Sequence, residues 1–149
     1  MKLVLRNWSL GLFLALMANG ASAVDIEFKN PESFKKLGLP FSEAVRVGDL
    51  LFLSGQLGNQ PGKLGLVEGG VTAETTQTME NIKAVLERNE LSLDRVVKCT
   101  VFLADIDEWP MVNDVYKTYF GENPPARSAL AASGLALGAR VEIECIAAY

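Results

Sequence analysis

Residues 44–53 read Ala-Val-Arg-Val-Gly-Asp-Leu-Leu-Phe-Leu, and this stretch sets the pattern of the fold. Two short apolar segments flank Gly48-Asp49, an arrangement typical of a β-hairpin. Glycine at the first central position suits a type II′ turn, because that position requires a positive φ angle. We therefore expect antiparallel strands at 44–47 and 50–53, joined by a tight turn.

The pattern changes from strand to helix C-terminal to this hairpin. Residues 58–70 contain five glycines and one proline, which indicates a surface loop. Residues 72–89 then show helical periodicity, with Thr72 as the expected N-cap. The apolar stripe of this helix consists of Met79, Ile82, Val85 and Leu86. Residues 96–104 are apolar and rich in β-branched side chains, so we expect a buried strand there.

A second helix and two more strands complete the chain. Asp107 is the expected N-cap, Pro110 is tolerated in the first turn, and Gly121 ends the helix. Its stripe, which we interpret as core, is Val112, Val115, Tyr116 and Tyr119. Strands follow near 126–132 and 140–148. The order hairpin, helix, strand, helix, strand, strand predicts an α+β fold in which two helices pack on one face of a mixed sheet.

The first 23 residues have the features of a secretory signal peptide. A basic opening at 1–6 is followed by an apolar run at 8–18 and by the small residues Ala21-Ser22-Ala23. The apolar run is too short for an ordinary membrane span, although an uncleaved anchor or a core helix is the alternative. We expect cleavage after Ala23, a single domain at 24–149, a periplasmic or secreted location, and no membrane association after cleavage.

The charge balance argues against nucleic acid as a partner. The 149-residue chain has 14 basic and 18 acidic residues, a net charge of −4. Loss of Lys2 and Arg6 with the signal peptide would bring it near −6. Nucleic-acid binding depends on clustered lysine and arginine, and no basic patch is visible in the sequence.

Two cysteines occur, Cys99 and Cys145, and both lie in apolar, strand-like segments. An exported chain could join them in one disulfide. Because cysteine is among the most buried residue types, we expect two free buried thiols instead. The chain has no histidine, so a zinc site lacks ligands, and a nucleophile activated by histidine is excluded.

Arg127 is the strongest candidate for a binding residue. It is the only charged residue between Glu122 and Arg140, and Pro124-Pro125 fixes the direction of the chain before it. A guanidinium cannot lose its proton, so it needs an anionic partner in such apolar surroundings. That partner is either a protein carboxylate, from Glu142 or Asp114, or the carboxylate of a small ligand held by two parallel hydrogen bonds.

Two acids near the C-terminus are candidates for proton transfer. Glu142 and Glu144 alternate with apolar residues, so both lie on one face of the last strand. Each could raise the pKa of the other, although a solvated sheet face is the alternative. Ser54 ends the second strand of the hairpin, and Asn113 lies on the second helix. Alone, these two are an ordinary strand end and an ordinary surface amide.

Together, these segments resemble the RidA (YjgF) family. The resemblance extends from about Pro40 to the C-terminus and includes several spaced motifs in the same order. The motifs are 48–56 (GDLLFLSGQ), 80–86 (ENIKAVL), 97–105 (VKCTVFLAD), 112–116 (VNDVY), 123–128 (NPPARS) and 141–144 (VEIE).

The resemblance implies a chorismate-mutase-like α+β fold and a homotrimer with ligand clefts between subunits. It implies hydrolysis of reactive 2-enamines and 2-imines of amino acids to 2-keto acids and ammonia, as in 2-iminobutanoate/2-iminopropanoate deaminases. Neither metal nor organic cofactor is expected. By position, Arg127 would bind the substrate carboxylate and Glu142 would position or activate water. Ser54, Asn113 and Phe41 would line the cleft.

This chain departs from the family pattern at a few positions. Phe41 stands where deaminases have a tyrosine, Glu43 where they have a glutamine, and Ala129 where they have a cysteine or threonine. Residues 133–140 also lack the familiar Arg-Leu-Pro sequence. The cleft is therefore more apolar, which favours substrates with larger apolar side chains. The alternatives are a non-catalytic trimer that binds small carboxylates, or a chaperone-like protective protein.

Overall fold

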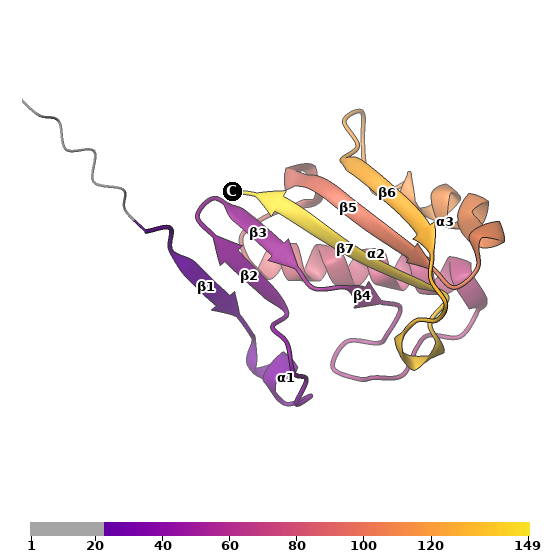
Figure 1. Ribbon diagram of the computed structural model, residues 1–149, viewed down its shortest axis with the longest axis horizontal. Helices are drawn as coiled ribbons and strands as arrows, with labels where there is room; N and C mark the ends of the chain where they lie inside the picture. The colour runs from indigo at the N-terminus through magenta and orange to yellow at the C-terminus, as the bar shows by residue number, and fades with distance from the viewer. Residues whose placement is uncertain (1–22) are drawn as a thin grey trace, which may run out of the picture.

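The computed structural model describes residues 23–149, and the predicted signal peptide lies almost wholly outside the described residues. One mixed sheet forms the centre of the domain (Figure 1). Its strands are β1 (Ile26–Lys29), β2 (Ala44–Val47), β3 (Leu50–Leu53), β4 (Gln56–Leu57), β5 (Val96–Leu103), β6 (Ala126–Ala131) and β7 (Val141–Ala148). The strand order is β1-β2-β3-β7-β5-β6, and β4 continues the line of β3 along β7. Only β5 and β6 are parallel among these described pairs.

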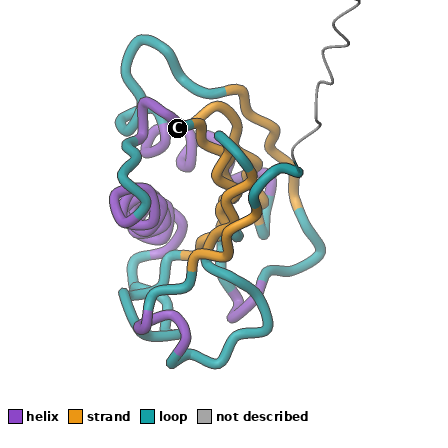
Figure 2. The backbone as a smooth tube through the Cα atoms, turned by 90° about the vertical axis from the view of Figure 1, so that its left-hand side faces the viewer, coloured by secondary structure: helices purple, strands orange, loops and turns teal. Residues whose placement is uncertain are grey.

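Two helices cover one face of the sheet (Figures 1 and 2). They are α2 (Gly70–Arg88) and α3 (Trp109–Tyr116), and a short helix, α1 (Glu32–Lys35), lies near the N-terminal strands. Single turns of 3-10 helix occur at Leu93–Arg95, Ile106–Glu108 and Ala136–Gly138. The predicted α+β architecture, with two helices on one face of a mixed sheet, is confirmed.

The core lies between the two helices and the sheet. Alternate residues of β5 and β7 point into it, as period-two strands require. The fully buried side chains with the largest volumes are Leu51, Met79, Ile82, Leu86, Leu103 and Ile143. The opposite face of the sheet, which we call the open face, has no helix over it within residues 23–149.

The hairpin forms as the sequence predicts. Val47 pairs with Leu50, and Gly48 has a φ angle of +56°, the left-handed conformation that glycine adopts without strain. Both helix caps were predicted wrongly. The N-cap of α2 is Gly69 rather than Thr72, and the N-cap of α3 is Glu108. The carboxylate of Asp105, rather than Asp107, caps the turn before α3 by accepting a hydrogen bond from the Asp107 amide.

The expectation of two free thiols is also wrong. Cys99 of β5 and Cys145 of β7 form a disulfide with Cα atoms 4.1 Å apart. The antiparallel register places these two residues directly opposite each other, with both side chains in the core. That distance lies a little below the usual range of about 4.4–6.8 Å for disulfides.

Candidate functional site

Arg127 lies near the start of the edge strand β6. In the parallel register it pairs with Cys99, whose side chain is in the core, so Arg127 points to the face that the helices cover. There its guanidinium carbon lies 4.7 Å from the centroid of the Tyr116 ring on α3. A guanidinium over an aromatic face is held by the quadrupole of the ring. The position of Arg127 is therefore set by an aromatic ring.

Neither of the internal carboxylates considered above pairs with Arg127. Asp114 forms its ion pair with Lys117 at 2.7 Å, and Glu142 lies on the opposite face of the sheet. Within the described residues, no ion pair or hydrogen bond of the Arg127 side chain is found. Its hydrogen-bond donors can therefore accommodate an external carboxylate.

A cavity of about 400 Å³ adjoins Arg127. It is lined by Asn113 and Tyr116 of α3, by Phe120 in the segment after α3, and by Pro124-Pro125. The amide oxygen of Asn113 and the hydroxyl of Tyr116 are both buried, and neither has a hydrogen-bond partner among residues 23–149. Buried polar atoms are normally paired, so these two atoms and the guanidinium favour a polar ligand at this place.

Burial keeps the Tyr116 hydroxyl protonated. It raises the pKa of this group to about 12, against the opposing effect of the Arg127 cation. Tyr116 is therefore a neutral hydrogen-bond donor across the physiological pH range. The sequence placed Tyr116 in the core stripe of the helix, and its side chain is indeed buried. What the helical spacing did not show is that Arg127 lies over its ring.

Glu142 belongs to a second group, on the open face of the sheet. It lies on β7 two residues from Glu144, and the alternation predicted for these two acids is present. Burial raises the pKa of Glu142 above its ordinary value, and the nearby negative charge of Glu144 raises it further. A carboxylate with a raised pKa is better suited to accept and return a proton near neutral pH.

Gly55 allows the Glu142 carboxylate to lie where it does. A Cβ atom added to Gly55 would lie 2.0 Å from Oε1 of Glu142, so any other residue would displace the carboxylate. Ser54, next to Gly55, donates a hydrogen bond from its hydroxyl to the carbonyl oxygen of Ser42 at 2.7 Å. The sequence indicated Ser54 as a candidate site residue. It could not show the close approach of Gly55 to Glu142, because this contact depends on the pairing of β4 with β7.

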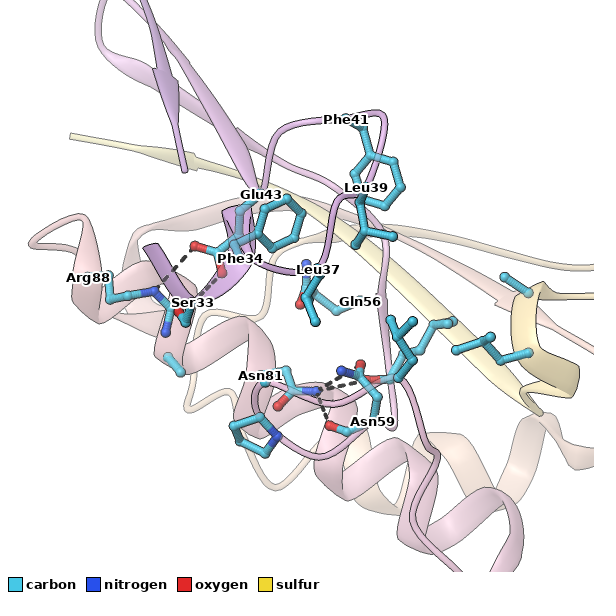
Figure 3. A pocket seen from close by; sticks show the side chains of 18 residues that line it. Ser33, Phe34, Leu37, Leu39, Phe41, Glu43, Gln56, Asn59, Asn81 and Arg88 are labelled. Carbon is cyan, nitrogen blue, oxygen red and sulfur yellow. Dashed lines mark hydrogen bonds and ion pairs between the residues drawn. The ribbon is translucent and has the colours of Figure 1, made fainter. Parts of the chain in front are cut away.

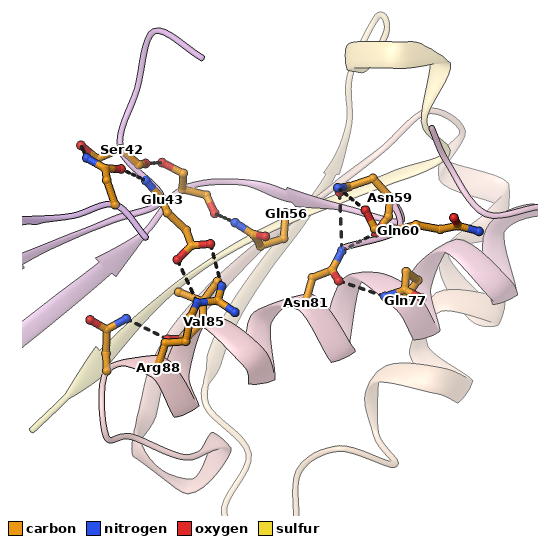
Figure 4. A network of polar contacts seen from close by, with 12 residues as sticks. Ser42, Glu43, Gln56, Asn59, Gln60, Gln77, Asn81, Val85 and Arg88 are labelled. Atoms are coloured by element: carbon orange, nitrogen blue, oxygen red, sulfur yellow. Dashed lines mark hydrogen bonds and ion pairs between the residues drawn. The ribbon is translucent and has the colours of Figure 1, made fainter. Parts of the chain in front are cut away.

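Phe41 lines a second cavity, of about 320 Å³, together with Gly55 (Figure 3). Its ring packs edge-on against Phe34 with centroids 5.9 Å apart. Glu43, which lines the same cavity, accepts hydrogen bonds of 2.6 and 3.3 Å from the Arg88 guanidinium (Figure 4). This pairing explains why a glutamate is tolerated at this nearly buried position.

One chain does not bring the five predicted site residues together. Arg127 and Asn113 lie on the face with the helices, and this group is called the arginine half. Glu142, Ser54 and Phe41 lie around Gly55, and this group is called the acid half. The sheet separates Arg127 from Glu142, because their strands present them to opposite faces.

Two further findings concern the described part of the chain. Residues 23–149 contain no group of three or more acidic or cysteine side chains that could hold a metal ion. No helix among them has both the length and the apolar character needed to cross a membrane.

Comparison with known proteins identifies the class of protein. Residues 35–149 match the family model described as Endoribonuclease L-PSP. The structure of RidA from the Antarctic bacterium Psychrobacter superposes on this chain with a TM-score of 0.71 and 40% sequence identity. The match covers 74% of this chain and 89% of the Psychrobacter chain. The fold is therefore the chorismate-mutase-like fold of these proteins.

Sequence relatives carry different names. The 2-iminobutanoate/2-iminopropanoate deaminase of Capra hircus is 47% identical over 108 residues, which are 72% of this chain and 79% of the relative. Protein HMF1 of Saccharomyces cerevisiae is 45% identical over 117 residues, 78% of this chain and 90% of the relative. The chain belongs to the RidA (YjgF) family.

Proposed function

We propose that this protein hydrolyses reactive 2-imines and 2-enamines of amino acids to 2-keto acids and ammonia. The observation that carries the proposal is the arginine half: an arginine without an ion pair in the described chain, beside two buried polar atoms without partners. This set of groups suits a small carboxylate. The name of the caprine relative, a 2-iminobutanoate/2-iminopropanoate deaminase, supports the reaction.

The reaction requires little more than orientation, water and a proton shuttle. Arg127 holds the substrate carboxylate through two hydrogen bonds. Glu142 accepts a proton from water as the water oxygen bonds to the imine carbon, and returning this proton to the nitrogen gives a carbinolamine. Glu142 then accepts the hydroxyl proton of the carbinolamine and passes it to the amino group, so that the carbon–nitrogen bond breaks, ammonia leaves and the carbonyl of the 2-keto acid forms. Holding the reactants in this geometry supplies most of the acceleration.

We further propose that the active protein is a homotrimer in which the arginine half of one subunit meets the acid half of its neighbour. The proposal is supported by the separation of Arg127 from Glu142 within one chain. It is also supported by apolar side chains on the open face, including Phe28 at 70% and Phe52 at 40% exposure. An apolar sheet face of this kind usually packs against another chain.

We also propose that the protein acts in the periplasm or is secreted. The Cys99–Cys145 disulfide supports an oxidising compartment, as does the signal-peptide pattern of the first 23 residues. The acidic composition supports a small-molecule partner rather than a nucleic acid.

The test measures ammonia and 2-keto acid release from freshly generated imines, above the rate without enzyme. We expect Arg127→Ala to abolish carboxylate binding, and Glu142→Gln to lower kcat by about 100-fold or more with binding largely retained. A wild-type protein that binds 2-keto acids at Arg127 without turnover would instead indicate a non-catalytic carboxylate binder. A protective effect on unfolding clients that survives Arg127→Ala would indicate a chaperone-like protein.

A further inference from the structure

The acid half adjoins the apolar cavity that Phe41 and Gly55 line, and the mechanism proposed above does not use this cavity. Its volume is about 320 Å³, at the lower end of the range for small-molecule sites. The apolar side chains around it come from α1, the loop that follows α1, the loop after β4, and the turn before β7 (Figure 3). They include Phe34, Leu37, Leu39, Phe41, Leu64 and Leu137.

Most of the polar side chains of this cavity are already paired with one another or with the backbone (Figure 4). Glu43 pairs with Arg88, and the side-chain amide of Asn81 donates to the carbonyl oxygens of Leu57 and Asn59, at 2.9 Å each. Gln56 donates to the Ser54 carbonyl oxygen at 3.0 Å. The cavity therefore offers little to a charged or strongly polar group, and an apolar group suits it better.

Apolar side chains at the rim of the cavity are left half exposed. Phe41 is 51%, Leu64 47% and Leu137 55% exposed. Leu137 also has a φ angle of +59°, a conformation that is uncommon for a bulky residue. Side chains held in such conformations cluster at ligand sites. An apolar ligand group in the cavity would cover part of the exposed surface of these side chains.

Gly55 connects this cavity with the acid half. It lines the cavity, and its Cα faces the Glu142 carboxylate so closely that a Cβ would lie 2.0 Å from Oε1. A substrate carbon held beside Glu142 is therefore next to the cavity. On the proposed function, the substituent on that carbon is the side chain of the parent amino acid.

We infer that this cavity receives the substrate side chain and selects 2-imino acids with bulky apolar side chains, such as those derived from leucine and phenylalanine. The inference rests on the proposed function. Each methylene group that the cavity removes from water should raise kcat/KM about fourfold. The leucine-derived imine should therefore exceed the alanine-derived imine by at least about tenfold in kcat/KM.

The experiment compares both imines, generated in place from alanine and leucine, with the purified protein. Leu137→Asn places a polar amide at the rim, and asparagine tolerates a positive φ angle. We expect it to lower the leucine-to-alanine ratio of kcat/KM about tenfold. Ile106→Asn is the matched control, because Ile106 is 51% exposed on a turn that does not line the cavity, and it should leave the ratio unchanged.

Binding of the stable products, 4-methyl-2-oxopentanoate and pyruvate, separates the two proposals. We expect the leucine-derived keto acid to bind at least about tenfold more tightly, and Leu137→Asn to remove this preference. Turnover of both imines with equal kcat/KM would overturn the side-chain cavity and leave the proposed function in place. Tighter binding of the larger keto acid without any turnover would support the cavity and reject the reaction. Equal binding without turnover would reject both.

Discussion

The ring of Tyr116 gives Arg127 a fixed position without neutralising its charge. A carboxylate in the same place would satisfy the guanidinium and compete with the substrate, whereas the ring attracts the cation and leaves its hydrogen-bond donors free. The ring centroid lies 4.7 Å from the guanidinium carbon, and the Tyr116 side chain is buried. Tyr116 is therefore expected to act as a positioning residue.

Two substitutions of Tyr116 distinguish its ring from its hydroxyl. Tyr116→Leu removes the cation–π contact, which contributes about 0.5–2 kcal/mol, so we expect KM to rise roughly tenfold. Tyr116→Phe keeps the ring and removes only the hydroxyl, whose hydrogen bond to a ligand contributes about 0.5–1.5 kcal/mol, so KM should rise by a smaller factor than in Tyr116→Leu. Steady-state kinetics with imine substrates measure both. Equal KM values for Tyr116→Leu and the wild type, in variants of equal thermal stability, would contradict the positioning role.

The raised pKa of Glu142 predicts how stability depends on pH. The folded protein holds the Glu142 proton more tightly than the unfolded chain does, because the ordinary pKa of 4.5 is raised by burial and by Glu144. The contribution of this group to stability is therefore present below pH 4.5 and is lost as pH rises through the raised pKa. The glutamine in Glu142→Gln is neutral at every pH. The Tm of this variant should therefore increase relative to the wild-type Tm as pH rises from 4.5 through the raised pKa of Glu142.

Glu144→Gln is the control for the pH prediction. It removes the neighbouring negative charge, and should therefore reduce the pH dependence of the Tm without abolishing it. Scanning calorimetry of the three proteins between pH 4 and 8 gives the comparison. A wild-type Tm that gains on that of Glu142→Gln as pH rises would contradict this prediction, and would mean that the neighbouring subunit's Arg127 approaches the Glu142 carboxylate closely enough in the ligand-free trimer to outweigh burial and Glu144.

At the scale of strands and helices, the sequence predicted the individual elements better than it predicted which strands pair with one another. Residues 44–53 formed the hairpin because their apolar pattern and Gly48 both favour it. β1 was missed because Ile26–Lys29 has only four residues, two apolar and two charged, which are too few to give a clear strand pattern. The disulfide was missed for another reason. The register of β5 against β7 depends on the assembled sheet, and two cysteines 46 residues apart carry no information about it.

The same reason applies to the candidate site. Alternation along β7 correctly placed Glu142 and Glu144 on one face. Which face Arg127 takes depends on β6 being parallel to β5, with Cys99 beside Arg127. The sequence motifs named the residues of both halves, but the periodicity within one strand cannot say that a sheet separates them.

The disulfide between β5 and β7 predicts a redox-dependent stability. Closing a loop of this size contributes about 4 kcal/mol in the chain-entropy model, with about 2–5 kcal/mol observed for native disulfides. We expect urea denaturation with dithiothreitol to show a lower midpoint than without it. The double variant Cys99→Ala/Cys145→Ala should unfold near the reduced midpoint and be insensitive to dithiothreitol. Equal midpoints for oxidised and reduced wild-type protein would contradict this prediction.

At the scale of the whole molecule, the open face is the surface that the proposed trimer would bury. Paired residues form an apolar row across four strands, because Phe28 pairs with Val45, Val45 with Phe52 and Phe52 with Ile146. A second row on the same face joins Glu142 to Phe102 and Phe102 to Leu130. The acid half thus lies at the end of an apolar surface, where a neighbouring subunit would bring its edge strand and its Arg127.

A complementation experiment tests this composite site. Arg127→Ala and Glu142→Gln each remove one half, so each homotrimer should be inactive. The Glu142→Gln variant keeps Arg127, and the Arg127→Ala variant keeps Glu142. When the two variants are mixed, dissociated and reassembled, a site is intact wherever the retained Arg127 of one variant meets the retained Glu142 of the other. Random assembly of equal amounts should restore about one quarter of the wild-type turnover. If both halves acted within one chain, mixing would restore none, because every subunit lacks one of the two residues. If neither residue carried the reaction, each variant would already be active before mixing.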